Sequence, residues 1–204
     1  MGRPKQFERE HVLAKATAIF RRHGFSATST QQLVEGLGIN RKSMYAEFGS
    51  KQGLFEAALD HYDRTTIQAN FGPLETDSAG LPEIEAVVNL FAGAARSGAA
   101  GLGCLLCNTA VERAANDADT SPYVDRYFDR LTNAFERALG NAKGRGTLSK
   151  KVDVLEQARF FTTSVIGIAV LVRAKALPEL VDASARVVLT HLHGLRSPPP
   201  RIAE

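Results

Sequence analysis

Apolar residues recur every three or four positions along almost the whole chain, the spacing of helices that bury one face. The first such segment places Val12, Ala16 and Phe20 on one side and ends at Gly24, a residue type that commonly terminates helices. We find no segment in which apolar and polar residues alternate as they do in a half-buried strand. The pattern predicts an all-α fold.

Two short helices follow, each with its own start signal. Ser29 and Gln32 have the spacing of a capping box, and Gly38 closes the helix that they begin. Asn40 can cap the next helix, which is predicted to run to about Phe48. These two helices and the segment before them predict a three-helix N-terminal head.

A fourth helix is predicted to start after Ser50 and to link the head to the rest of the chain. The segment 70–82 is the one long turn-rich connection, so we place the domain boundary just before it. This gives an N-terminal domain of residues 1–68 and a larger helical domain of residues 69–204. Helical patterns in the second domain lie at about 83–96, 101–116, 122–139, 152–175 and 178–195.

The segment Phe160–Val172 is apolar on all sides. It is shorter than the about 20 residues that cross a bilayer, so we expect no membrane partner. A helix of this kind must be covered all round, which favours a homodimer formed through the last two helices. A purely intramolecular core is the alternative.

Charge is unevenly distributed. Residues 1–51 contain nine Lys or Arg and four acidic residues, a net charge of +5, whereas the whole chain carries +3. A basic head suggests a polyanion as partner, and a solvated charged face is the alternative. The polar N-terminal sequence lacks the apolar core of a signal peptide, and the two cysteines are too close together to staple a secreted scaffold. We expect a soluble cytoplasmic protein.

The helices joined across residues 36–40 have the pattern of a helix-turn-helix, whose second helix enters the DNA major groove. Met44 and Phe48 face inward, whereas Arg41 and Lys42 face outward at the helix start, where side chains can reach guanine acceptors. Groups suited to phosphate oxygens are carried by Thr30, Ser43, Tyr45 and Lys51.

The stretch FRRHGFSATSTQQLVEGLGINRKSMYAEFGSKQGLFEAAL resembles the DNA-binding head of the tetracycline-repressor (TetR) family, over about residues 8–62. The chain departs from the common pattern at Lys42, where many members have glycine, and at Ala46 and Glu47. The segment Gly2–Lys5 resembles basic arms that enter minor grooves, and a disordered terminus is the alternative. The resemblance implies DNA contacts at Arg3, Lys5, Thr30, Asn40, Arg41, Lys42, Ser43, Tyr45 and Lys51.

The same resemblance implies a homodimeric repressor that binds double-stranded DNA at a near-palindromic operator and is released by a small-molecule inducer. A DNA-binding architectural protein without a ligand is the alternative. We find no set of residues with the pattern of a nucleophile and its base, no phosphate loop and no metal-ligand cluster. The expectation is therefore no enzyme, no cofactor and no metal.

The stretch GLGCLLCNTAVE resembles a segment found in one branch of the family, which includes regulators of enzymes that handle reactive carbonyls and electrophiles. On a helix, Cys104, Asn108 and Glu112 lie on one face, as a pocket wall or a structural network. We expect these three residues to bind the ligand. Glu112 and an apolar wall would disfavour a thiolate at Cys104, so thiol-based sensing stays a second possibility.

Overall fold

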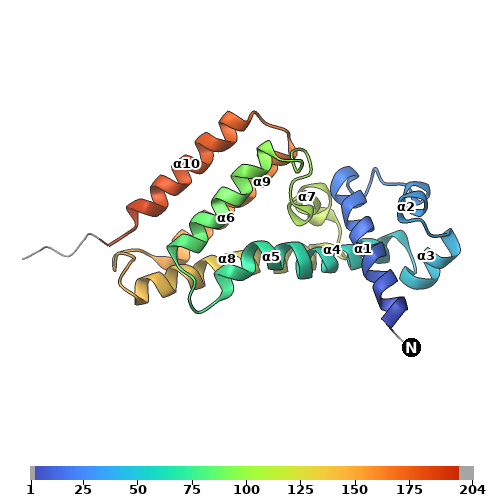
Figure 1. Ribbon diagram of the computed structural model, residues 1–204, viewed down its shortest axis with the longest axis horizontal. Helices are drawn as coiled ribbons and strands as arrows, with labels where there is room; N and C mark the ends of the chain where they lie inside the picture. The colour runs from blue at the N-terminus through green and yellow to red at the C-terminus, as the bar shows by residue number, and fades with distance from the viewer. Residues whose placement is uncertain (1–2, 198–204) are drawn as a thin grey trace, which may run out of the picture. The chain divides into compact units, whose positions relative to one another are not determined.

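The computed structural model describes residues 3–197, which form α-helices joined by turns and short 3-10 segments (Figure 1). Within these residues, extended pairing is limited to an isolated bridge between Leu148 and Arg196. The predicted all-α class is confirmed. The chain forms two compact units.

The first unit contains the chain up to Gln68 and, from much later in the sequence, residues 101–127. We expected every residue after 68 to belong to the second domain, but the segment 101–127 packs against α1 and α4. The helices of this unit are α1 (Arg3–His23), α2 (Thr30–Leu37), α3 (Arg41–Phe48), α4 (Lys51–Tyr62) and α7 (Leu105–Glu112).

Side-chain caps begin α2, α3 and α4, as the sequence predicts. The Ser29 hydroxyl accepts a hydrogen bond from the Gln32 N–H at 3.1 Å, and the Gln32 side chain accepts one from the Ser29 N–H at 2.7 Å. Asn40 Oδ1 accepts from the Ser43 N–H at 2.8 Å, and the Ser50 hydroxyl caps α4 in the same way. Each cap stabilises its helix by about 1 kcal/mol.

Apolar packing holds the first three helices against α4. Phe20 of α1 meets Phe55 of α4 edge to face, with ring centroids 4.9 Å apart, and both rings are buried. Met44 of α3 is fully buried, whereas its neighbours in α3 are exposed. Burial of one such side chain contributes roughly 1.5–3 kcal/mol, so this core fixes which face of α3 points outward.

The chain stays helical beyond α4. A π-helical turn (Asp63–Ile67) leads into α5 (Gln68–Phe71), and a 3-10 turn (Gly72–Glu75) follows. Ile67 and Phe71 are fully buried, so the apolar face of α4 extends through them. The connection that the sequence predicts over 70–82 therefore begins only after Phe71.

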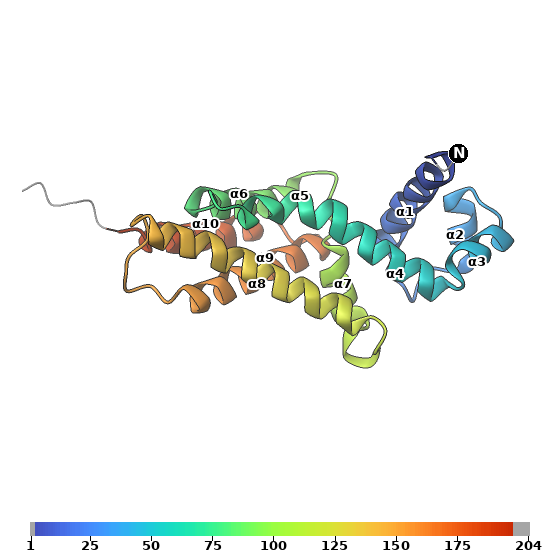
Figure 2. The same ribbon diagram turned by 90° about the horizontal axis from the view of Figure 1, so that it is seen from below.

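The second unit contains residues 69–100 and those from Phe128 onward. Its core includes a series of rings in which Phe71 meets Phe91 at 5.6 Å and Phe135 at 6.2 Å, and Phe135 meets Phe161 at 5.9 Å. In both views α10 runs alongside α6 (Figures 1 and 2). The main helices are α6 (Leu81–Gly93), the later part of α8 (Ser121–Gly144), α9 (Val154–Arg173) and α10 (Pro178–Gly194).

Only one face of α9 is covered within a protomer. Phe161 and Val165 are buried, but 39% of Phe160 and 43% of Val170 are exposed. The expectation that 160–172 is enclosed on every side is therefore not met by one copy of the chain. The neighbouring helix α10 and its start also expose apolar side chains, namely Leu177, Leu180 and Val187.

The helix α9 is also longer than the apolar run that the sequence analysis considered. By length and composition alone it meets the criterion for a membrane span, with a mean hydropathy of 1.4 and 33% of that window buried. An apolar helix packed in a soluble protein meets the same criterion.

Candidate nucleic-acid interface and its link to α7

The exposed face of α3 carries the residues that the sequence places against DNA. Arg41, Lys42 and Ser43 occupy its first turn and are exposed, and 41% of Tyr45 is exposed one turn later. The side chain of Asn40 is engaged as the helix cap. The cation-bearing start of α3 is thus open to a partner.

The other expected contact residues lie at helix starts. Thr30 is the first residue of α2, and Lys51 is the first residue of α4; both are half-buried. Free N–H groups and the helix dipole favour anions at such positions. Arg3 and Lys5 fall within α1, which begins at Arg3, so that part of the expected arm is helical. Gly2 lies outside the described residues.

A hollow of about 570 Å³ lies beside α3, between α1 and the α2–α3 turn. Its lining includes the basic residues Arg9, His11 and Lys15 of α1. Arg9 pairs with Glu47 of α3 at 3.1 Å. Arg9 and Lys15 belong to the basic head predicted from the sequence, but nothing in the sequence places them next to α3.

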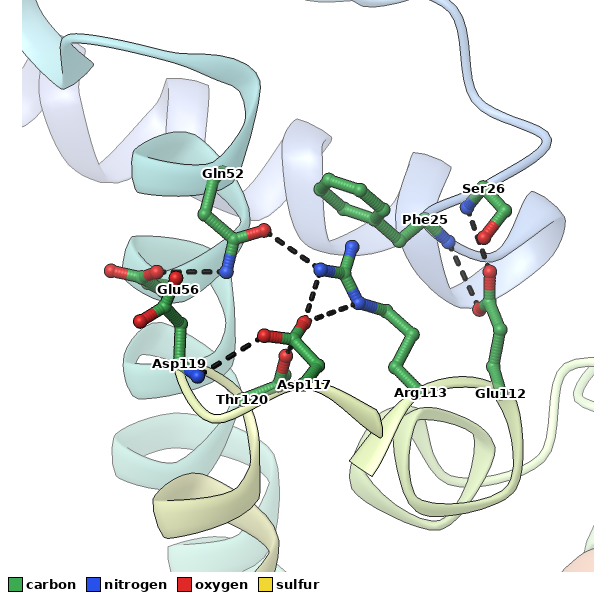
Figure 3. A network of polar contacts seen from close by, with 9 residues as sticks. All are labelled: Phe25, Ser26, Gln52, Glu56, Glu112, Arg113, Asp117, Asp119 and Thr120. Carbon is green, nitrogen blue, oxygen red and sulfur yellow. Dashed lines mark hydrogen bonds and ion pairs between the residues drawn. The ribbon is translucent and has the colours of Figure 1, made fainter. Parts of the chain in front are cut away.

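The turn between α1 and α2 is held by a carboxylate from α7 (Figure 3). Glu112 Oε2 accepts a hydrogen bond from the Phe25 N–H at 3.0 Å, and Oε1 accepts one from the Ser26 N–H at 2.7 Å. Burial raises the pKa of the Glu112 carboxyl, but these hydrogen bonds and the charge of Arg113 outweigh it, and the pKa is lowered. Glu112 is therefore ionised at neutral pH.

Two cationic side chains lie close to the ring of Phe25. The Arg113 guanidinium carbon is 3.6 Å from the ring centroid, and Lys51 Nζ is 4.1 Å from it. Arg113 also donates to Gln52 of α4 at 3.0 Å and forms an ion pair with Asp117 (Figure 3). Burial and the charge of Arg113 lower the pKa of Lys51, and Glu112 opposes this shift.

Cys104 precedes α7 as its N-cap residue, so it does not continue the helical face of Asn108 and Glu112. Asn108 donates to the Leu102 carbonyl at 2.9 Å, whereas Glu112 binds the α1–α2 turn at the far end of the helix. The three expected ligand-binding residues thus have three separate sets of partners. Their hydrogen bonds match the structural-network alternative for Asn108 and Glu112.

The two cysteines share a buried polar cluster. Cys104 Sγ and Cys107 Sγ lie 3.5 and 3.4 Å from the Tyr127 hydroxyl. Burial raises the pKa of Cys104, but hydrogen bonds from Cys107, Tyr127 and Tyr62 lower it to about 6. The hydrogen bond to Cys104 and burial raise the pKa of Cys107. The sequence analysis expected burial and Glu112 to disfavour a thiolate at Cys104; these hydroxyl and thiol donors act in the opposite direction.

Phe25 and Arg113 belong to the site but were not predicted from the sequence. The glycine and aromatic residue that follow α1, Gly24 and Phe25, were the sequence signal that could have indicated this turn. Nothing in the local sequence indicates that residues 112–113, which lie far along the chain, contact that turn.

The downward pKa shift of Glu112 predicts a pH-dependent contribution to stability. The lowered pKa means that the carboxylate stabilises the fold above the unfolded-state pKa of about 4.3 and ceases to do so as pH falls through the folded-state value. We expect Glu112→Gln to lower Tm at pH 7 and the difference from the parent to shrink below about pH 4. Calorimetry at several pH values measures this, with Glu136→Gln on α8 as the control. A difference that stays constant down to pH 3 would contradict the assignment.

The fold and the exposed α3 face define a helix-turn-helix DNA-binding regulator. The family model described as bacterial regulatory proteins, tetR family, matches residues 12–58, and the tetracyclin repressor-like C-terminal domain matches residues 80–188. The chain belongs to the TetR family of bacterial transcription regulators, and its members are regulators rather than enzymes.

Relatives cover almost the whole chain. The HTH-type transcriptional regulator YezE of Bacillus subtilis (strain 168) is 30% identical over 193 residues, which is 92% of this chain and 100% of YezE. The HTH-type transcriptional repressor ComR of Escherichia coli (strain K12) is 30% identical over 183 residues, 87% of this chain and 85% of ComR.

Solved structures share the fold. A TetR regulator from Chloroflexus aurantiacus J-10-FL superposes with a TM-score of 0.82 at 23% identity, over 95% of this chain and 98% of its own. A cysteine mutant of the TetR-family regulator CifR, complexed with 26-bp operator DNA, gives a TM-score of 0.79 at 23% identity. That match covers 89% of this chain and 95% of CifR.

Proposed function

We propose that this protein is a cytoplasmic homodimeric repressor that leaves a near-palindromic operator when a small-molecule inducer binds. The observation that carries the proposal is the exposed start of α3, where Arg41, Lys42 and Ser43 stand on a helix fixed from behind by Met44. The recognition helices of a dimer lie in successive major grooves, which sets the spacing of the two half-sites. Family relatives described as repressors support the direction of control.

The contact residues divide by the chemistry that they offer. Arg41 and Lys42 are placed for base edges, where bidentate donors recognise guanine. Hydroxyl and ammonium groups at the other positions suit phosphate oxygens, which fix the register of the protein on DNA. These phosphate contacts are Thr30, Ser43, Tyr45 and Lys51. Asn40 is a further contact residue next to the start of α3, and Arg3 and Lys5 of the N-terminal arm are proposed to reach a minor groove.

A gel-shift titration tests this function. The dimer is mixed with the DNA immediately upstream of its own gene, because many regulators of this kind control their own expression, and with a shuffled duplex of equal length. We expect a specific complex at least about 10³-fold tighter than the non-specific one at physiological salt. Equal affinity for both duplexes would contradict sequence-specific regulation.

We propose that the inducer is a reversibly bound apolar molecule that acts on α7 beside Cys104, Asn108 and Glu112. The proposal is supported by the polar cluster at the start of this helix, where thiols and phenols lie among apolar side chains. Such convergent polar groups in apolar surroundings are typical of small-molecule sites. Binding would favour the arrangement of the heads that fits the operator less well, and the extent of release is set by the difference in ligand affinity between the two states.

Covalent sensing at Cys104 is a second candidate, favoured by its lowered pKa. Against it, only 3% of Cys104 is exposed, so a reagent has little access to the sulfur. We therefore expect N-ethylmaleimide at low concentration to have the same small effect on operator binding by the parent and by Cys104→Ser. Release from the parent alone, with a mass increase of one adduct at Cys104, would show that the thiolate adds to the reagent and that this protein is a covalent sensor.

A further inference from the structure

The contacts of α7 converge on one part of the head. Residues 101–127 lie within the C-terminal family model, yet they pack in the same compact unit as α1–α4. Arg21 of α1 donates to the Gly103 carbonyl at 2.7 Å, just before α7 begins. At the other end of α7, Glu112 and Arg113 reach the turn between α1 and α2 and the start of α4.

The Glu112 carboxylate is positioned by the backbone of that turn. Its two oxygens each accept one N–H, from Phe25 and Ser26, which lie between helices and have no place in a helical ladder. Gly24 makes this approach possible. Its φ is +79°, and a Cβ on it would lie 2.6 Å from Glu112 Oε2. The glycine is needed both for its conformation and for the room that it leaves.

Arg113 extends the same link from the turn to α4. Its guanidinium stacks on Phe25 and donates to Gln52, one residue after the start of α4. Asp117 pairs with the guanidinium from within the 101–127 segment and holds it in place (Figure 3). A planar guanidinium can stack and donate in its own plane at once, which an ammonium cannot do.

These contacts lie close to the DNA-facing residues. Phe25 is shared between Arg113 and Lys51, and Lys51 is both the first residue of α4 and a predicted phosphate contact. The α1–α2 turn leads directly into the capping box that starts α2. A shift of α7 must therefore move the turn with it or break the hydrogen bonds to Glu112.

We propose that Glu112 and Arg113 are positioning residues that couple α7 to the orientation of α2 and α3, so that displacement of α7 changes the half-site spacing that the dimer accepts. The inference rests on the proposed function and adds to it the residues that carry the signal. Both residues act through Phe25 and Gln52 and do not themselves contact DNA.

A purely structural role accounts less well for this arrangement. The first unit is held by a fully buried apolar core that includes Phe20, Met44 and Phe55, whereas Glu112 lies at the surface. The polar contacts of an exposed carboxylate such as Glu112 contribute only a small part of the net stability because water competes for them. These contacts do fix the orientation of the α1–α2 turn relative to α7, because a carboxylate that accepts two N–H groups can be placed in few ways.

The test uses the full-length dimer and an operator selected from a random duplex pool, so no inducer is required. Affinity is measured for that operator, for the same half-sites with two base pairs inserted between them, and for an isolated half-site. We expect the parent to disfavour the lengthened spacer by about tenfold or more, because the two recognition helices of a dimer fit half-sites at one separation. Glu112→Ala and Arg113→Lys should reduce this discrimination to about threefold or less and leave half-site affinity within about twofold.

The control is Val111→Ala, since Val111 is the neighbouring residue and 80% of it is exposed. It should discriminate as the parent does. Hydrogen–deuterium exchange at residues 25–26 should accelerate in Glu112→Ala and stay unchanged in Val111→Ala.

Unchanged spacing discrimination in both Glu112→Ala and Arg113→Lys would overturn the inference. So would equal losses of affinity on all three duplexes that scale with a lowered Tm, because that is the result of a structural role alone. Failure to select any duplex would instead overturn the proposed function, which separates the two outcomes.

Discussion

Val187→Glu should convert the dimer into monomers and reduce operator affinity by about 10²–10⁴-fold, the gain that linking two binding modules supplies. Val187 lies on α10 with 69% of its surface exposed in a protomer, and Leu180 on the same helix is 52% exposed. A carboxylate placed in an apolar interface is buried without a partner, which costs several kcal/mol. Leu180→Glu should have the same effect for the same reason.

Analytical ultracentrifugation measures the oligomeric state, and gel shift on the operator measures affinity. Leu90→Glu is the matched control, because Leu90 is also a half-exposed apolar residue but lies on α6. Val172 of α9 is not a suitable position for this test. Only 3% of it is exposed, so a glutamate there would disrupt the protomer itself. An intact dimer for both Val187→Glu and Leu180→Glu would place the interface on other helices.

The head could be predicted well from the sequence because its signals are local. A capping residue and the backbone N–H that it binds are three positions apart. The starts of α2, α3 and α4 could therefore be predicted from Ser29, Asn40 and Ser50. The inward face of α3 follows from the same short-range periodicity, with Met44 buried between exposed neighbours. The residues offered to DNA are those that remain on the outward face.

The role of α7 could not be predicted because its partners are distant in sequence. Glu112 binds N–H groups about 86 residues earlier in the chain, and backbone donors leave no mark in the sequence. The predicted helix over 101–116 was also too long. Gly101 and Gly103 adopt positive φ and delay the start of α7 to Leu105, which puts Cys104 at the cap.

The hydrogen-bond donors around Cys104 could not be predicted for a related reason. Helical spacing points only to neighbours on the same helix, such as Cys107, whereas Tyr62 and Tyr127 reach Cys104 from other helices. A hydrogen bond from a phenol stabilises a buried thiolate without a formal charge. Such donors become apparent only when the helices are placed together.

Phosphate and base contacts should separate when single residues of the interface are replaced. Tyr45→Phe removes a hydroxyl and Lys51→Ala removes an ammonium, so both should lower affinity about equally on operator and random DNA. The salt dependence should become shallower for Lys51→Ala, because fewer counterions are released on binding. Lys151→Ala, an exposed lysine of the second unit, is the control and should change neither quantity.

Arg41→Ala and Lys42→Ala should instead reduce discrimination between the operator and duplexes with single mismatches. Each bidentate contact with a base is worth about 1–3 kcal/mol of discrimination, and both side chains stand exposed on the first turn of α3. Competition titrations at one fixed salt concentration measure the ratio of the two affinities for each variant. Non-specific affinity should fall only slightly, since it depends on the remaining phosphate contacts. If both variants lost operator and mismatch affinity in equal proportion, Arg41 and Lys42 would be contacts to phosphate, and the specificity of this protein would have to come from other residues or from the shape of the DNA.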